Sequence, residues 1–307
     1  MGEFQINGGK RLSGRLRITG GKNAVLPILA ATVINGDESV IHNCPMISDT
    51  FTTVEILEKL GCAVKREGST LTVDSSGADK WEVPVSLAKE MRSSTLFMGG
   101  LLGRFGKAAV SHPGGCNLGD RPIDLHEYAL SALGAKVETI DGIVHCRTEG
   151  LSGAQIVFSL PSVGATENAM IAAVCAPGVT VIMNAAREPE IVDLQKFLNS
   201  MGADVRGAGT IRIEITGGKR LRRAEHTVMP DRITTGTYLA AAAITGGSIF
   251  LTDVTPEDMT PVTMKLREAG CVVKEGISSI FLDAPRALNS VSRITTQPHP
   301  GLPDCVI

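Results

Sequence analysis

Residues 57–64 read LEKLGCAV. The pattern of this phrase, Leu-x-x-Φ-Gly-x-x-Val with Φ apolar or Ala, occurs three more times along the chain. The other copies are LSALGAKV from Leu130, LNSMGADV from Leu198 and LREAGCVV from Leu266. Their glycines stand 73, 68 and 68 residues apart. An apolar helical segment that ends at a glycine and continues into a valine is typical of a helix with a left-handed residue after its end, followed by a strand. The even spacing indicates an internal repeat.

Each copy of the phrase leads into two apolar runs around a polar turn, which predicts a β-hairpin. The four hairpins read VKREGSTLTVD, VETIDGIVHCR, VRGAGTIRIEI and VVKEGISSIFLD. Upstream of each phrase lies a second helical stretch rich in small residues, which favours close packing inside a core. These stretches read NAVLPILAATVI, SSTLFMGGLLGRF, ATENAMIAAVCA and TTGTYLAAAAI. A further strand follows each of them, as in KAAVSH, VTVIMN and SIFLTDV.

One unit is therefore strand, helix, strand, helix and hairpin, within roughly 70 residues, and the fold class is α/β. Such units must stack, because one unit cannot bury its apolar face alone. The repeat by itself leaves open whether the units form a solenoid or close into domains.

The composition points to a globular chain of about two domains. Of the 307 residues 43% are hydrophobic and 20% are charged, and the net charge of −2 gives no reason to expect a nucleic-acid partner. The apolar run at 24–34 is shorter than the ~20 residues of a membrane span, and the first residues lack the apolar core of a signal peptide. Seven scattered cysteines without a CxxC pair argue against disulfides and zinc. We expect a cytoplasmic protein with no metal, no cofactor and no membrane partner.

Residues 111–126 read SHPGGCNLGDRPIDLH, a glycine-rich loop that carries a thiol. Glycines tolerate positive φ, which favours an exposed turn around Cys116. Arg121 follows closely, and Lys22 and Arg92 are candidates to converge on it; nearby positive charge lowers the pKa of a thiol and activates it. A buried cysteine that acts as a small hydrophobe is the alternative.

Five segments in register carry a family resemblance that extends over residues 4–303. They are ITGGKNAVLPILAA, SHPGGCNLGDRPIDLH, PSVGATEN, NAAREPEIVDLQKFL and MPDRITTGTYLAAAAI. Together they resemble the UDP-N-acetylglucosamine 1-carboxyvinyltransferase family of enolpyruvyl transferases. The related shikimate-pathway transferases share the fold but are not expected to show this cysteine loop.

The resemblance implies an inside-out α/β barrel fold with two domains of three repeated units each. Residues 22–229 would be a complete domain that carries the cysteine loop and a nucleotide-sugar clasp. Residues 1–21 with 230–307 would form the discontinuous catalytic partner domain. Six units are expected and four are found, and GLPDCVI at residues 301–307 departs from the family's Pro-x-Phe-Pro-Thr-Asp-Met-Gln. We therefore expect a truncated or frame-shifted chain that associates through exposed core faces.

The implied reaction transfers the enolpyruvyl group of phosphoenolpyruvate to the 3-hydroxyl of UDP-N-acetylglucosamine and releases phosphate. In the family this is the first committed step of peptidoglycan synthesis, on which cell wall, cell shape and cell division depend. The enol methylene must be protonated while the sugar oxygen attacks, so an acid and a base are needed. By resemblance Cys116 is the acid, the site of adduct formation and the target of fosfomycin.

Both substrates are anionic, so the site needs fixed positive charge. Lys22, Arg92 and Arg121 match the family's basic residues; taken alone, each would be an ordinary surface charge. Asn23 matches a residue at the reacting centre, and a helix N-cap is its alternative interpretation.

The segment from Arg121 to Leu125 resembles the family's uridine clasp. Asp124 would bind the base edge, Pro122 and Leu125 would enclose the base, and Ile123 lies between them. A turn followed by a helix start would also explain this run.

Ser162, Val163 and Gly164 match the run that contacts the diphosphate, where amides near a helix start suit an anion. Some members carry a lysine two positions before this serine, where this chain has Leu160.

The general base is the weakest assignment. The family's aspartate falls at Cys305, and Asp304 is one residue away, where an extended chain reverses the side-chain direction. Two alternatives to an active transferase follow. The chain could be a truncated, non-catalytic UDP-sugar-binding protein, or an unrelated α/β repeat scaffold, which would leave the motif register unexplained.

Overall fold

The structure is a computed structural model that describes residue 3 and residues 5–112 and 122–302. The chain forms two compact units. The larger unit is Lys22–Met229, and the smaller combines Met1–Gly21 with Pro230–Ile307. Each unit is built from the repeat that the sequence predicts.

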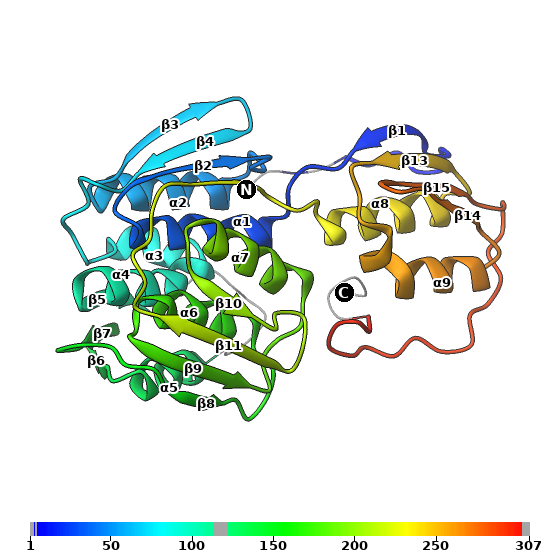
Figure 1. The fold of residues 1–307 in the computed structure, drawn as a ribbon. Coiled ribbons are helices and arrows are strands. Elements are labelled where there is room, and N and C mark those ends of the chain that lie inside the picture. Colours follow the sequence, from blue (N-terminus) through cyan, green and yellow to red (C-terminus); the bar gives the residue numbers. More distant parts are fainter. Residues whose placement is uncertain (1–2, 4, 113–121, 303–307) are drawn as a thin grey trace. The chain divides into compact units, whose positions relative to one another are not determined.

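The larger unit contains three copies of the repeat (Figure 1). The first consists of α1 (Lys22–Ala31), η1 (Thr32–Ile34), β2 (Glu38–His42), α2 (Ser48–Lys59), β3 (Ala63–Glu67) and β4 (Thr70–Asp74). The second consists of α3 (Val85–Glu90), η2 (Arg92–Leu96), α4 (Phe97–Phe105), β5 (Lys107–Ser111), α5 (Asp124–Ala132), β6 (Lys136–Ile140) and β7 (Ile143–Arg147). The third consists of β8 (Gln155–Val157), α6 (Val163–Cys175), β9 (Gly178–Met183), α7 (Pro189–Ser200), β10 (Asp204–Arg206) and β11 (Arg212–Gly217).

The three sheets share one strand order. In the third repeat the order is β10-β11-β9-β8, with β8 parallel to β9 and the other pairs antiparallel. The second sheet, β5-β7-β6, has an isolated parallel bridge from Glu82 to Ala109 in place of the outer strand. In the first sheet, β12-β2-β4-β3, the outer strand β12 (Ala224–Thr227) comes from the far end of the unit. The last strand of the unit thus completes its first sheet.

The smaller unit holds the fourth copy. Its elements are β1 (Ser13–Arg17), α8 (Arg232–Ile244), β13 (Ser248–Thr252), η3 (Pro256–Met259), α9 (Thr260–Glu268), β14 (Val272–Glu275) and β15 (Ser279–Asp283). Its sheet has the order β1-β13-β15-β14, so the N-terminal strand takes the outer parallel position. The unit is therefore discontinuous in sequence.

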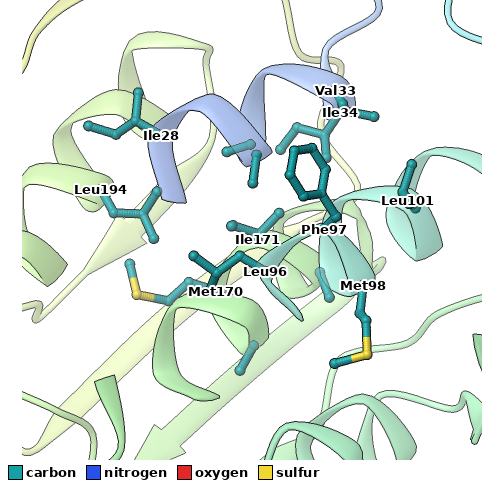
Figure 2. Close-up of a cluster of buried hydrophobic side chains, with 14 of the residues drawn as sticks. Ile28, Val33, Ile34, Leu96, Phe97, Met98, Leu101, Met170, Ile171 and Leu194 are labelled. Carbon is teal, nitrogen blue, oxygen red and sulfur yellow. The ribbon is translucent and has the colours of Figure 1, made fainter. Parts of the chain in front are cut away.

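Helices occupy the inside of the larger unit and sheets its outside (Figure 1). Eight of the ten residues of α1 and ten of the thirteen in α6 are buried. Figure 2 shows how Ile28 of α1, Phe97 of α4 and Ile171 of α6 meet in this core. Across the described residues the strands form four separate sheets, none of them closed into a barrel. The predicted inside-out α/β fold is confirmed.

The glycine of each repeated phrase follows the end of a helix in the left-handed region, as predicted. The φ angles are +97° at Gly61, +99° at Gly134, +98° at Gly202 and +93° at Gly270. This conformation turns the chain from helix into hairpin.

A second left-handed position was not predicted from the sequence. Asn43, Asn184 and Asp253 each follow the second strand of a repeat, with φ between 54° and 58°. The side-chain amide of Asn43 donates to the carbonyl of Val228 at 3.0 Å, and that of Asn184 donates to Phe158 at 3.0 Å. These bonds tie the end of each second strand to the end of its parallel partner.

Candidate functional site

A cavity of about 530 Å³ opens within the larger unit, where the starts of α1, η2 and α6 come together. Six residues that the sequence singled out line it: Lys22, Asn23, Arg92, Ser162, Val163 and Gly164. They come from all three repeats of the unit. The fold therefore gathers positions that lie up to about 140 residues apart in the sequence.

The start of α6 presents backbone donors to this cavity. Ser162 is the N-cap residue, and its hydroxyl accepts a hydrogen bond from the amide of Ala165 at 3.4 Å. The first amides of a helix have no carbonyl partner within the helix, and the helix dipole makes this end positive. The backbone amides of Val163 and Gly164 therefore suit an anionic group.

Two basic side chains, those of Lys22 and Arg92, line the same cavity. Lys22 is the first residue of α1, and its Nζ lies 3.2 Å from Oδ2 of Asp49 on α2. Arg92 begins η2 on another wall. Asn23 is the second residue of α1, so its interpretation as an N-cap is wrong. Its exposed side chain lies on the cavity wall instead.

His126 also lines the cavity, although only 5% of the residue is exposed. Its Nδ1 lies 3.0 Å from the side-chain nitrogen of Asn168 on α6. Burial and, to a smaller degree, the Arg92 charge lower the pKa of His126 to about 4, and Asp124 acts weakly in the opposite direction. The imidazole is therefore neutral at physiological pH.

Glu167 is a buried carboxyl group on the same wall. Burial raises the pKa of Glu167 well above its ordinary value, and the charges of Glu190 and Glu188 raise it further. Its Oε1 has no hydrogen-bond partner within the described part of the chain. Burial and these neighbouring charges favour the protonated form of the carboxyl group, which can donate a hydrogen bond.

Comparisons with known proteins show the family of the chain. A family model described as EPSP synthase (3-phosphoshikimate 1-carboxyvinyltransferase) matches residues 6–307. A UDP-N-acetylglucosamine 1-carboxyvinyltransferase 2 of Caldanaerobacter subterraneus subsp. tengcongensis is 49% identical over 303 residues, which are 99% of this chain and 73% of that protein. The chain belongs to the UDP-N-acetylglucosamine 1-carboxyvinyltransferase family. A family member from Symbiobacterium thermophilum is 50% identical over 98% of this chain and 69% of its own length.

Solved structures of the wider family share the fold. The enolpyruvyl transferase NikO from Streptomyces tendae superposes with a TM-score of 0.84 at 26% identity, covering 96% of this chain and 71% of that one. An EPSP synthase from Acinetobacter baumannii gives a TM-score of 0.70 at 20% identity over 92% of this chain and 67% of its own. The second likeness concerns the fold alone.

The segment that resembles the family's uridine clasp lies beside the cavity. Ile123 is buried in the core, Leu125 is half-buried, and Pro122 and Asp124 are exposed. None of these four residues lines the cavity, whereas the next residue, His126, does. The segment is also the turn and start of α5, which agrees with the structural alternative.

Three residues implied by resemblance to the carboxyvinyltransferase family lie outside the described residues: Cys116, Arg121 and Asp304. Their roles stay predictions.

The sequence reading missed six polar residues that line the cavity: Asp49, Glu90, Ser93, Thr95, His126 and Glu167. One signal was available, because Glu167 and Asn168 stand in a helix otherwise made of small and apolar residues. A charged residue and an amide in such a helix need a specific partner or a function.

The cysteines that the structure describes are free, and four of these five are buried. Burial raises the pKa of Cys44, Cys62, Cys146 and Cys175 to about 12, so these thiols are unreactive. The described residues contain no cluster of side chains suited to a metal ion. None of their helices is long and apolar enough to span a membrane.

Proposed function

We propose that this chain transfers the enolpyruvyl group of phosphoenolpyruvate to the 3-hydroxyl of UDP-N-acetylglucosamine and releases phosphate. The observation that carries the proposal is the convergence, in one cavity, of the open start of α6 with Lys22 and Arg92. Relatives that carry the name of this activity are 44–50% identical to the chain.

The charge distribution of the cavity suits two anionic substrates. The diphosphate of the sugar nucleotide would bind at Ser162, Val163 and Gly164, where backbone amides point out of the helix. The phosphate and carboxylate of phosphoenolpyruvate would bind near Lys22 and Arg92, because charge-assisted hydrogen bonds are about twice as strong as neutral ones. Asn23 would stand at the reacting centre between them.

The chemistry proceeds by addition and elimination. A proton is added to C3 of the enol while the sugar oxygen attacks C2 and gives up its own proton. Loss of phosphate from C2 and of a proton from C3 then restores the double bond. By resemblance Cys116 supplies the first proton and Asp304 is the candidate base.

The finer assignments extend this proposal. We place the uridine against Pro122, Asp124 and Leu125, and the catalytic partner role in residues 1–21 with 230–307. The product would enter peptidoglycan synthesis in the cytoplasm, and fosfomycin would alkylate Cys116.

The test is release of phosphate by the purified chain given both substrates. Turnover that needs both substrates and is lost in Cys116→Ser supports the proposal; Cys175→Ser, a thiol distant in sequence and without a proposed role, is the matched control. No turnover with retained binding of UDP-N-acetylglucosamine would instead favour a non-catalytic nucleotide-sugar binder.

We also propose that the chain associates through the smaller unit. Ile244 of α8 is 80% exposed and Met264 of α9 is 61% exposed, and Tyr238 adds a third large side chain. Large apolar side chains exposed in this way are candidates for an interaction surface. Light scattering of the chain and of Ile244→Lys tests this: association that the charge abolishes supports the proposal, and a monomer at every concentration contradicts it.

A further inference from the structure

We propose that His126 is a substrate-binding residue whose neutral ring, fixed by Asn168, donates a hydrogen bond from Nε2 to an anionic oxygen of the ligand at the start of α6. Asn168 is then a positioning residue. The inference deepens the proposed function and rests on it for the identity of the natural ligand, a nucleoside diphosphate derivative.

The hydrogen bonds of Asn168 leave no freedom in its orientation. Its Oδ1 lies 2.6 Å from the backbone nitrogen of Gly99, which can only donate. Its Nδ2 lies 2.9 Å from the carbonyl oxygen of Thr95, which can only accept. The amide of this fully buried residue therefore cannot be flipped.

This fixed amide decides where the proton of His126 lies. One hydrogen of Nδ2 serves Thr95, and the other points to Nδ1 of His126 at 3.0 Å. Because Nδ2 is a donor, Nδ1 must be the acceptor. A neutral imidazole with Nδ1 unprotonated carries its proton on Nε2.

The Nε2 edge of the ring lies beside the helix start. A methyl group built on Gly164 would stand 3.0 Å from Cε1 and 3.2 Å from Nε2 of His126. His126 lines the cavity, and no described residue bonds to its Nε2. Nε2 of this buried side chain, which has no partner among the described residues, thus lies beside the first turn of α6.

The surrounding charges keep this donor neutral. Arg92 disfavours a second positive charge on the ring, and burial disfavours any charge at all. Asp124 opposes them weakly, and Glu167, whose pKa is raised by burial, faces the same cavity. Because the ring does not titrate near neutral pH, its hydrogen bond to the ligand does not depend on pH there.

The ligand group must accept hydrogen bonds and carry negative charge. The α6 amides, the Nε2–H of His126 and the cations Lys22 and Arg92 are all donors, as a phosphate oxygen requires. A phosphate oxygen also carries the negative charge that the positive end of a helix favours, and a sugar hydroxyl does not. We therefore assign the donor to the diphosphate and not to the sugar.

The first measurement is a ¹⁵N–¹H correlation spectrum of the histidine rings in the full chain, with and without UDP. We expect His126 with its proton on Nε2, neutral from pH 8 down to pH 5, and a shift of that proton on binding. A proton on Nδ1, or protonation near pH 6.5, would overturn the inference without any variant being made.

The second measurement is calorimetric binding of UDP and of uridine. His126→Phe should weaken UDP about tenfold, the effect of one hydrogen bond to a charged group, and leave uridine unchanged. His126→Gln, whose amide can accept from Asn168 and donate to the ligand, should restore UDP affinity to within about threefold. Equal UDP binding by His126→Phe and wild type overturns the inference.

Asn168→Asp tests the positioning role. A carboxylate beside Nδ1 requires a proton there, so UDP binding should become dependent on pH between 5 and 8, where that of wild type is flat. A flat profile with the proton still on Nε2 removes Asn168 from the inference. A chain that binds UDP as predicted but releases no phosphate refutes the proposed reaction alone, whereas a chain that binds no UDP refutes the inference.

Discussion

Two helices begin at equivalent points of the repeat, α6 in the larger unit and α8 in the smaller, and their first turns are satisfied differently. Asp231 caps α8, and its Oδ1 accepts the amides of Ile233 at 2.8 Å and Thr234 at 3.1 Å. Ser162 caps α6 with a single long bond of 3.4 Å to Ala165. One helix thus carries its own anion at its positive end, and the other presents that end to a cavity.

The difference separates a helix start that is open to a ligand from one whose amides are already occupied. A helix start whose first amides already donate to the carboxylate of the N-cap residue has few backbone donors left for a ligand. At α6 the shorter, neutral serine leaves the second amide, that of Gly164, without a capping bond among the described residues. The start of α1 is a third case, because it carries the cation Lys22, which Asp49 neutralises from the neighbouring helix.

The largest effect should come from making α6 resemble α8. Ser162→Asp places a carboxylate where we propose that the ligand's phosphate binds, and two like charges about 4 Å apart at an effective dielectric constant near 20 repel by roughly 4 kcal/mol. We expect affinity for UDP-N-acetylglucosamine to fall on the order of 1000-fold, measured by calorimetry.

Ser162→Asn is the matched control for this change, because it caps as well and adds no charge. Both variants should be at least as stable as wild type. Tight binding by Ser162→Asp would show that the open helix start is not the diphosphate site.

The second effect concerns pH and the ring beside α6. His126 has a pKa of about 4 in the folded chain against 6.5 when unperturbed. Its stabilising contribution is therefore complete above pH 6.5 and is lost as the pH falls from 6.5 through 4, by roughly 3 kcal/mol in all.

Urea unfolding of wild type and His126→Gln from pH 7.5 to pH 4 measures this contribution. Glu167, whose raised pKa makes the fold less stable as pH rises, acts in both proteins and cancels in the difference. Parallel pH profiles for the two proteins would contradict a buried neutral histidine.

A third, smaller effect separates the two caps. Asp231→Ala removes two backbone caps and should lower the free energy of unfolding by about 1–2 kcal/mol, whereas Ser162→Ala should cost about 0.5 kcal/mol. Denaturant unfolding measures both. A larger loss at Ser162 than at Asp231 would mean that serine caps α6 as firmly as aspartate caps α8.

The smallest effect should appear at the start of α1. Asp49→Asn removes the partner of Lys22, in a pair whose lysine side chain is 49% exposed, so we expect a stability change within about 1 kcal/mol. The quantity to measure for Asp49→Asn is the KM for phosphoenolpyruvate, which should change less than about fivefold. A larger rise would show that Asp49 positions the lysine and does not merely neutralise it.

The repeat and its elements could be read from the sequence because their signals are local. A glycine after a helix, a polar turn between two apolar runs and a helix of small residues are decided within a few residues. The positive φ angles at Gly61, Gly134, Gly202 and Gly270 confirm that reading. The left-handed Asn43 and Asn184 escaped it, because their amides bond to strands that are distant in the sequence.

The residues of the site were likewise predicted from the sequence only in part. Motif resemblance predicted Lys22, Asn23, Arg92, Ser162, Val163 and Gly164, and the fold brings these six to one cavity. It gave no role to His126 or Glu167, although both lie within the quoted segments SHPGGCNLGDRPIDLH and PSVGATEN. The burial that lowers the pKa of His126 and raises that of Glu167 comes from packing against other repeats.

The sequence by itself determined that this protein is an α/β repeat of one family, since periodicity, capping and motif register are properties of short segments. Only the tertiary structure decided that β12 completes the first sheet and that Asn168, 42 residues from His126, fixes its proton. The physical reason is that protonation state and hydrogen-bond direction depend on which groups are packed together after folding. The contacts between repeats cannot be predicted from the sequence of any single repeat.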